Sequence, residues 1–262
     1  METKIIQELA YRLDAAVLGA MPLPRLSLEY PELSLEDAYQ IQSRGIDLRR
    51  RRGESVIGYK MGLTSSAKMK QMGVTAPIAG VLTQKMRIEL PRSFLKSRAI
   101  HPKIEPEIAV ILAHPIHSSL SFEEAVLVCA SIGPAAEIID SRFENFKFTL
   151  PDVVADNCSS SSFVLGKMMP FPLNDPRVSV DDLKMTLSEN NEVLESGNSG
   201  SILGHPIRSI VALSQIAAAQ GWEIPGGSIV LCGSATAAIP LEKGKFYRVS
   251  VEGFEEFALR TE

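Results

Sequence analysis

One strand-like stretch decides the fold of the larger part of this chain: His101-Pro-Lys-Ile-Glu-Pro-Glu-Ile-Ala-Val110. Successive side chains of a strand point to opposite faces, so Glu105 and Glu107 share one face, roughly 6 to 7 Å apart along the strand. The intervening residues give the other face its apolar character. A strand with one acidic face either exposes its carboxylates to water or holds a cation between them.

A cation site on this strand needs a further carboxylate, and Glu137 is the candidate. It lies in a second short strand-like run, Pro134-Ala-Ala-Glu-Ile-Ile-Asp-Ser-Arg142, among small and branched apolar residues. Acidic side chains are rarely buried unless they are paired or bind a metal. Three carboxylates without histidine or cysteine suit a hard cation such as Mg²⁺ or Mn²⁺. A solvated acidic face is the alternative, because the Glu-x-Glu pattern is common on exposed strands.

The composition is that of an ordinary globular protein. The 262 residues are 45% hydrophobic and 22% charged, and the formal net charge is −4. This balance gives no basic field for nucleic acid or an anionic membrane, and no apolar run is long enough to span a bilayer. The three cysteines, Cys129, Cys158 and Cys232, are scattered without metal-ligand spacing. We therefore expect a cytoplasmic protein with no nucleic-acid or membrane partner.

The pattern of helices and strands divides the chain in two. Amphipathic helices are expected near residues 5–18 and 35–48, and the basic run 49–52 fits the solvated end of the second. Ser34 and Asp37 give a capping signal for that second helix, and a capping box at Ser121–Glu124 predicts a further helix through Ser131. Residues 185–193, broken at Asn190-Asn191, are expected to form a hairpin. After residue 86 the chain becomes rich in strands. This change predicts a small N-terminal domain over residues 1–85 and a larger catalytic domain over residues 86–262.

Lys60 is the candidate basic group. Residues 55–63 are expected to form a strand on which Lys60 shares a face with Gly58 and Gly62, so the surface beside it is hollow. Its ammonium can counter an anionic ligand or transfer a proton. The alternative is a lysine that extends from an edge strand into water. Residues 74–80, which are mostly small, are expected to form a connecting loop or a lid.

The remaining motifs narrow the chemistry. The tract Ser159–Ser162 follows Asp156 and Asn157 and is expected to be a loop whose hydroxyls can reach a carboxylate. Signatures of dinucleotide sites, phosphate loops, serine hydrolases and zinc proteases are absent from the sequence. A metal-assisted enzyme without an organic cofactor is therefore the leading interpretation.

Five motifs, taken in order, resemble those of the 2-oxopent-4-enoate hydratase and 4-oxalocrotonate decarboxylase group of the fumarylacetoacetate hydrolase superfamily. They are Lys60-Met-Gly-Leu-Thr-Ser65, Met69-Lys-Gln-Met-Gly-Val74, His101-Pro-Lys-Ile-Glu-Pro-Glu-Ile108, Glu137-Ile-Ile-Asp-Ser-Arg-Phe-Glu-Asn-Phe-Lys-Phe148 and Val154-Ala-Asp-Asn157. The resemblance covers most of the chain. It implies an α+β (mixed α/β) fold, in which a small α/β N-terminal part joins a larger, mostly β, barrel-like C-terminal part.

The resemblance also implies a site. In this family the Glu-x-Glu pair and a later glutamate hold Mg²⁺ or Mn²⁺, which assigns Glu105, Glu107 and Glu137 as ligands, and Lys60 lies at the active site. Candidate contacts to the substrate are Leu63, Ser160, Ser161 and Thr236.

The activity implied is decarboxylation of 2-oxo-3-hexenedioate to 2-hydroxypenta-2,4-dienoate and CO₂, in the meta-cleavage catabolism of aromatic compounds. Residues 67–73 and 144–148 resemble the decarboxylases. The hydratases typically carry an aspartate and an aromatic residue before the loop glycine, where this chain has Ile78-Ala79-Gly80. Ala79 also differs from the aromatic residue expected in a decarboxylase. Hydration of 2-hydroxypentadienoate is the alternative, and a non-catalytic partner subunit that binds an oxo-acid is the third interpretation.

The expected partners follow from the same resemblance. The substrate is a small 2-oxo dicarboxylic acid, and the chain is expected to form a homo-oligomer. Because the dienol product is unstable, the resemblance also suggests a complex with the 2-oxopent-4-enoate hydratase that acts next.

Overall fold

The computed structural model describes residues 1–172 and 179–262, with all of their side chains except those of Ala67, Lys68 and Gln71. The α-helices in these ranges are α1 (Thr3–Gly19), α2 (Leu35–Arg51), α3 (Ser66–Met72), α4 (Phe122–Leu127), α5 (Leu150–Ala155) and α6 (Arg208–Gln220). The strands are β1 (Val56–Gly62), β2 (Ile78–Thr83), β3 (Lys103–Leu112), β4 (Cys129–Ile139), β5 (Ser160–Leu165), β6 (Met169–Pro170), β7 (Lys184–Glu189), β8 (Glu192–Asn198), β9 (Ile229–Ser234), β10 (Ile239–Pro240), β11 (Phe246–Val251) and β12 (Phe257–Arg260).

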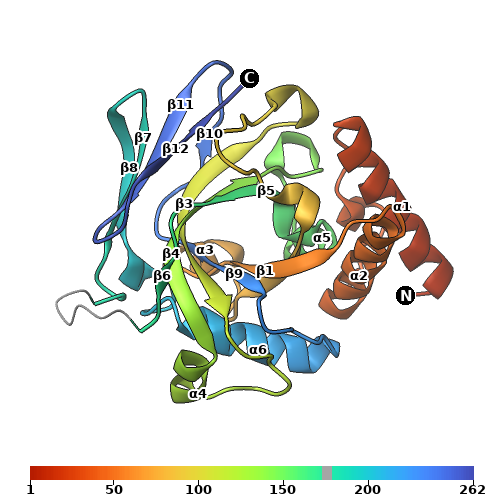
Figure 1. Cartoon of the computed structure of the whole chain (residues 1–262). Coiled ribbons are helices and arrows are strands. Elements are labelled where there is room, and N and C mark those ends of the chain that lie inside the picture. The colour runs from red at the N-terminus through yellow and green to blue at the C-terminus, as the bar shows by residue number, and fades with distance from the viewer. Residues whose placement is uncertain (173–178) are drawn as a thin grey trace.

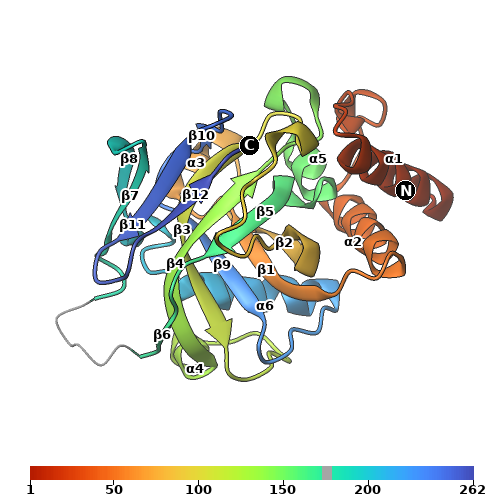
Figure 2. The same cartoon turned by 45° about the horizontal axis from the view of Figure 1, so that its top comes forward.

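Two sheets form the centre of the molecule. The larger sheet has the order β2-β1-β9-β3-β4-β5, with β10 and β6 added at β3 and β4, and the smaller has the order β12-β11-β7-β8. Figure 1 shows the larger sheet curling around the centre, with the smaller sheet on one side and helices α1 and α2 on the other. The same arrangement is visible after rotation (Figure 2). The α+β class and the curled, barrel-like β part agree with the expectation from the sequence.

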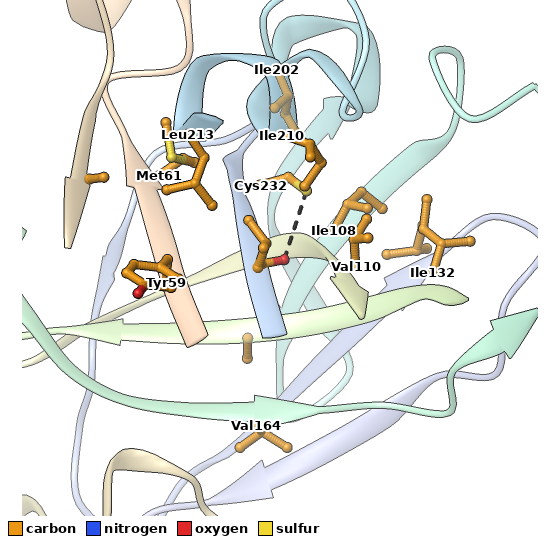
Figure 3. Close-up of a cluster of buried hydrophobic side chains, with 14 of the residues drawn as sticks. Tyr59, Met61, Ile108, Val110, Ile132, Val164, Ile202, Ile210, Leu213 and Cys232 are labelled. Atoms are coloured by element: carbon orange, nitrogen blue, oxygen red, sulfur yellow. Dashed lines mark hydrogen bonds between the residues drawn. The ribbon is translucent and has the colours of Figure 1, made fainter. Parts of the chain in front are cut away.

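The main hydrophobic core lies on one face of the larger sheet. It includes Ile104, Ile108 and Val110 of β3, all of which are fully buried. Figure 3 shows Ile108 and Val110 among residues of β1, β4, β9 and α6, such as Met61, Ile132 and Leu213. The alternation read from the sequence of β3 is therefore observed, because its aliphatic residues point into this core.

A smaller core continues the acidic face of the same sheet. Ala109 follows Glu105 and Glu107 on that face, and it clusters with Ala135, Phe163 and Leu231 from the neighbouring strands. The acidic side chains therefore lie beside a buried apolar cluster, which excludes water from this side of them.

The N-terminal helices form a separate layer. A capping box between Ser34 and Asp37 starts α2, as the sequence predicted. Helices α1 and α2 share a hydrophobic cluster with α5. Arg49 differs from the expected solvated helix end: it is buried at 9% exposure and lines a small pocket with residues of α1, α2 and α5. The division at residue 85 stays a prediction, and the pairing of β1 with β9 favours a boundary nearer residue 55.

Three expectations about local structure were wrong. Residues 78–80 belong to strand β2 and not to a loop or lid, because they pair with β1. The serine tract begins strand β5, which pairs with β4. The helix expected to run from residue 121 to 131 ends at Leu127, since Cys129 already starts β4.

The helices and the cysteines can also be compared with the expectations from the sequence. None of the helices in residues 1–172 and 179–262 combines the length and the apolar character needed to cross a bilayer. The three cysteines are free and buried.

One buried ion pair joins the segment after β4 to the segment before β5. Arg142 and Asp156 are both nearly inaccessible to water, and the guanidinium Nε donates to the Asp156 carboxylate. Burial raises the pKa of Asp156 to about 6, against the opposing effect of Arg142. At pH 8 the carboxylate is therefore charged and neutralises a buried cation.

We predict that Asp156→Asn lowers the free energy of unfolding by about 3 to 5 kcal/mol at pH 8, because it leaves a buried guanidinium without its counter-charge. Urea denaturation followed by circular dichroism measures this change. The matched control is Glu255→Gln, which removes one partner of the exposed Lys167–Glu255 pair and should leave the midpoint unchanged. Equal midpoints for both variants would show that the buried pair contributes nothing to stability.

Candidate active site and metal centre

Three glutamates meet on the acidic face of the larger sheet. Glu105 and Glu107 are on β3, and Glu137 on β4 is the direct cross-strand partner of Glu105. One carboxylate oxygen from each lies within 4.8 Å of those of the other two. All three side chains are buried, with residue exposures of 5%, 0% and 0%. A solvated acidic face is therefore ruled out for these residues.

The electrostatics of this cluster are unfavourable without a cation. Burial raises the pKa of Glu107 well above its usual value, and the charges of Glu137 and Glu105 raise it further. Burial also raises the pKa of Glu137, although the nearby Lys60 ammonium opposes this shift. Like charges held close together in an apolar setting resist ionisation. A divalent cation at this point would reverse both shifts, because it stabilises the ionised carboxylates.

The backbone of β9 fixes one of these carboxylates. Gly233 donates its N–H to Glu107 Oε2 at 2.9 Å. Its φ of 109° suits glycine, and a Cβ at this position would lie 2.0 Å from Thr64 Oγ1. Only glycine therefore allows Thr64 to pack here while the amide reaches Glu107.

Lys60 lies against the cluster and is not at an edge. Strand β1 pairs with β2 on one side and with β9 on the other, and Lys60 has an exposure of 3%. Its Nζ is 3.0 Å from Glu137 Oε2 and donates to the Cys158 carbonyl at 3.1 Å. Burial acts to lower the pKa of Lys60, but the acidic neighbours, led by Glu137, outweigh burial and raise it. The lysine is therefore a buried ammonium and not a neutral amine.

Gly58 and Gly62, the two glycines beside Lys60, are required for different reasons. A Cβ at Gly62 would come within 3.9 Å of Lys60 Nζ, so this glycine keeps space open near the ammonium. A Cβ at Gly58 would instead lie 2.0 Å from the Ile229 carbonyl oxygen, so Gly58 permits close contact with β9.

The four residues expected to contact the substrate differ in how they lie relative to Lys60 and the glutamates. Ser160 Oγ is buried, makes no hydrogen bond within the described part of the chain, and would lie 3.1 Å from a Cβ at Gly80, the strand partner of Lys60. Thr236 follows Ser234, the strand partner of Glu107, and its hydroxyl donates to the Ala237 carbonyl. Leu63 ends β1 in a left-handed conformation with φ 56°. Ser161 lines a small pocket with Arg98 and Asp140, and none of the contacts described here joins it to the glutamates.

A wide cleft of about 1080 Å³ lies elsewhere, between α2 and the end of α6. Tyr59 and Val81, which line it, alternate along their strands with Lys60 and Gly80, so the cleft opens on the other face of β1 and β2. Size alone would point to this cleft, but the buried titratable groups are on the acidic face.

Sequence reasoning missed several groups that complete the site. Three are backbone or glycine positions: the amide of Gly233, the carbonyl of Cys158, and Gly80, whose missing side chain admits the Asn157 carbonyl. Backbone groups leave no signal of their own in a sequence. The glycines are the available clue, because a glycine inside a strand indicates close approach by another group.

The residues present fit a hard divalent cation. Glu107 Oε1 and Glu137 Oε1 are buried and accept no hydrogen bond from the described residues, while Glu137 Oε2 faces the Lys60 ammonium at 3.0 Å. Such orphaned oxygens are costly unless a missing ion or water satisfies them. An all-carboxylate donor set is the kind that Mg²⁺, Mn²⁺ or Ca²⁺ prefers.

A family model described as the fumarylacetoacetate (FAA) hydrolase C-terminal domain matches residues 60–260, which include all of these groups. The chain belongs to the fumarylacetoacetate hydrolase family. Among curated relatives, a 4-oxalocrotonate decarboxylase of a Pseudomonas species is 39% identical over 98% of this chain and 98% of its own length. A 2-keto-4-pentenoate hydratase of Paraburkholderia phymatum is 32% identical over 95% of this chain and 94% of its own length.

A solved structure of the same family superposes over the whole chain. It is 4-oxalocrotonate decarboxylase from Pseudomonas putida G7, complexed with magnesium and adipate, with a TM-score of 0.95 and 34% identity. The superposition covers 100% of this chain and 99% of that one. The fumarylacetoacetate hydrolase-like fold implied by the sequence motifs is therefore confirmed.

We predict that Mg²⁺ or Mn²⁺ raises the melting temperature of this protein, since a ligand that binds only the folded state stabilises it by about 2.7 kcal/mol at a hundred times its Kd. Glu107→Gln should fold but lose most of this shift, because one ligand charge is gone. Differential scanning fluorimetry with and without each cation measures the effect. Glu255→Gln, at an exposed position, is the control that should keep the full shift. An undiminished shift in Glu107→Gln would remove Glu107 from the cation site.

Proposed function

We propose that this chain is a metal-dependent lyase that decarboxylates 2-oxo-3-hexenedioate (4-oxalocrotonate). The products are CO₂ and 2-hydroxypenta-2,4-dienoate, an intermediate of aromatic catabolism by meta-cleavage. The observation that carries the proposal is the buried cluster of Glu105, Glu107 and Glu137 beside Lys60. It occurs in a chain that aligns along nearly its whole length with 4-oxalocrotonate decarboxylases.

The cofactor that fits is Mg²⁺, with Mn²⁺ as the alternative. Glu105, Glu107 and Glu137 would hold it, and the Gly233 amide fixes Glu107 Oε2 while Oε1, which has no hydrogen-bond partner among the described residues, would be available as a ligand. A bound divalent cation acts as a Lewis acid for an oxygen that becomes negatively charged during the reaction.

Decarboxylation shifts three electron pairs along the substrate, from the C5–C6 bond to the C2 oxygen. The C5–C6 bond breaks and C6 leaves as CO₂. The released electrons form the C4=C5 bond, the C3=C4 double bond shifts to C2=C3, and the C2 oxygen becomes negative. The site must therefore place positive charge and hydrogen-bond donors at the C2 oxygen, where electrostatic catalysis has most effect.

Lys60 is suited to that position. An ammonium has three N–H groups, and Glu137 and the Cys158 carbonyl engage two of them. The third can donate to the substrate, orienting it and then protonating the oxygen of the dienolate. We assign the carboxylate contacts to Ser160, Ser161 and Thr236, and we assign Leu63 to the apolar part of the substrate.

Hydration of 2-hydroxypentadienoate is the second candidate function. The hydratase cited above aligns with this chain at 32% identity, which is lower than the 39% of the decarboxylase. A non-catalytic partner subunit is the third, and the complete glutamate cluster with Lys60 argues against it.

We predict that the purified protein releases CO₂ from 2-oxo-3-hexenedioate when Mg²⁺ is present and does not when the cation is chelated. An ultraviolet assay of substrate loss, coupled to direct detection of CO₂, measures this. If CO₂ is absent and 2-hydroxypentadienoate is instead converted to 4-hydroxy-2-oxopentanoate, the protein is a hydratase. Cation binding without turnover of either compound would support the non-catalytic interpretation.

We further propose a cytoplasmic homo-oligomer that binds a 2-oxopent-4-enoate hydratase. The chemical reason is that a dienol product decays in water unless the next enzyme takes it up. We predict that a related hydratase co-purifies with this chain, and that size-exclusion chromatography with light scattering gives a mass above that of a single subunit. Separate elution of the two proteins at micromolar concentration would contradict a stable complex, and a monomeric mass would contradict self-association.

A further inference from the structure

The segment between α5 and β5 has an unusual backbone. Asn157, Cys158 and Ser159 are three successive residues with positive φ, at 49°, 53° and 58°. The left-handed conformation is unfavourable for residues other than glycine, because it brings Cβ close to the backbone carbonyl oxygen. We call residues 157–159 the left-handed turn. It persists only if its surroundings hold it in place.

The side chain of Asn157 ties this turn to β2. Its Oδ1 accepts from the Val81 N–H at 2.7 Å, and its Nδ2 donates to the Val81 carbonyl at 2.9 Å. The side-chain amide therefore makes the same pair of hydrogen bonds with Val81 that a residue of a neighbouring strand would make. Gly80 makes the approach feasible, because a Cβ there would lie 2.7 Å from the Asn157 carbonyl oxygen.

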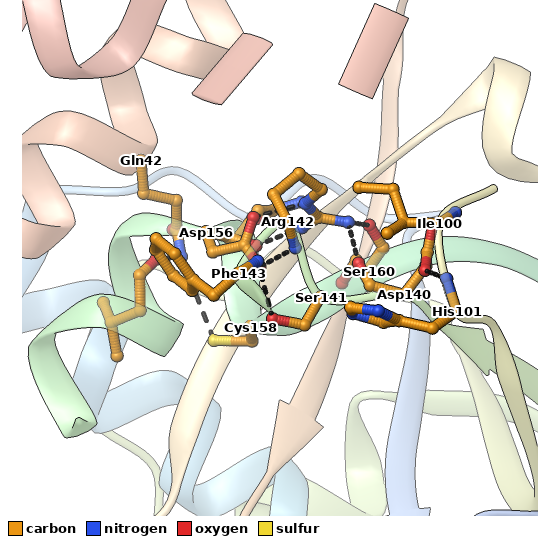
Figure 4. Close-up of polar contacts among 12 residues, drawn as sticks. Gln42, Ile100, His101, Asp140, Ser141, Arg142, Phe143, Asp156, Cys158 and Ser160 are labelled. Atoms are coloured by element: carbon orange, nitrogen blue, oxygen red, sulfur yellow. Dashed lines mark hydrogen bonds and ion pairs between the residues drawn. The ribbon is translucent and has the colours of Figure 1, made fainter. Parts of the chain in front are cut away.

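Arg142 holds the backbone on both sides of the turn. Its guanidinium donates to the carbonyl of Asp156, just before the turn, and to the carbonyl of Ser160, just after it. Figure 4 shows Arg142 between Asp156 and Ser160, with Cys158 nearby. A second contact comes from Gln42 of α2, whose Nε2 lies 4.0 Å from Cys158 Sγ.

The turn presents one group to the active site, the Cys158 carbonyl that accepts from Lys60 Nζ at 3.1 Å. Burial raises the pKa of the Cys158 thiol to about 12, so the side chain is a neutral thiol. Lys60 is also the strand partner of Gly80. The turn, β2 and the lysine therefore form one packed unit, in which Asn157 sets where the carbonyl stands.

We propose that Asn157 is a positioning residue of the reaction: by clamping the left-handed turn to Val81, it holds the Cys158 carbonyl that directs the Lys60 ammonium toward the substrate. This inference rests on the proposed function of Lys60. Two of the three N–H directions are set by Glu137 and Cys158, so loss of the carbonyl frees the ammonium to rotate and aim elsewhere. Displacement of a reacting group by about 1 Å can slow an enzyme on the order of a hundredfold.

The test is Asn157→Gly, which tolerates the left-handed backbone but lacks the amide clamp. The kcat for CO₂ release should fall on the order of 10- to 100-fold. The KM and the stabilisation by Mg²⁺ should stay at wild-type values, because the glutamates are untouched. A residue that only supports the fold would lower the melting temperature without this separation of kcat from KM. A crystal structure should show Lys60 Nζ displaced from the Cys158 carbonyl.

Asn190→Gly is the matched control. Asn190 is also left-handed, with φ 45°, and its Oδ1 also accepts a backbone N–H from a neighbouring strand, that of Phe246. Asn190 lies between β7 and β8 in the smaller sheet, so the kcat of Asn190→Gly should equal that of the wild type.

A folded Asn157→Gly protein with kcat within twofold of wild type, or with Lys60 unmoved, overturns the inference. If Asn157→Gly does not fold, Asn157→Asp, which keeps the acceptor for the Val81 N–H, is judged by the same two measurements. If the wild type releases no CO₂, the proposed function fails, and the position of Lys60 in the crystal structure of the variant decides the positioning role alone.

Discussion

The structure depends on the burial of three carboxylates side by side in an apolar sheet. Glu105, Glu107 and Glu137 come from two adjacent strands, and the alternation of β3 forces its aliphatic neighbours into the main core. The same pairing that buries the core therefore buries the acids. Such a cluster is tolerated only with compensating positive charge: Lys60 supplies one such charge, and the divalent cation proposed above would supply the rest.

Much of the surrounding structure keeps these groups in fixed directions. Gly233 gives its amide to Glu107, and the left-handed turn gives the Cys158 carbonyl to Lys60. Both are backbone groups, which have few degrees of freedom once the chain is folded. The site is thus oriented by backbone groups of β9 and of the turn before β5, and such fixed groups are what electrostatic catalysis requires.

Local patterns in the sequence predicted local structure well. The alternation around Glu105, the capping box at Ser34 and the hairpin after Lys184 all appear where they were expected. Predictions failed where pairing outweighs composition: the serine tract and residues 78–80 look like loops but join the larger sheet. Their polar or small side chains matter less than the hydrogen bonds that neighbouring strands offer.

The sequence by itself determined which residues carry charge on one face of β3, that Lys60 has glycines beside it, and, through five motifs, the family and its chemistry. Tertiary structure alone decided that Glu137 stands opposite Glu105, that Lys60 is buried between two strands, and that Asn157 clamps the turn to Val81. The physical reason is that periodicity reports on neighbours along the chain. Contacts between strands far apart in sequence depend on register, which only the folded sheet fixes.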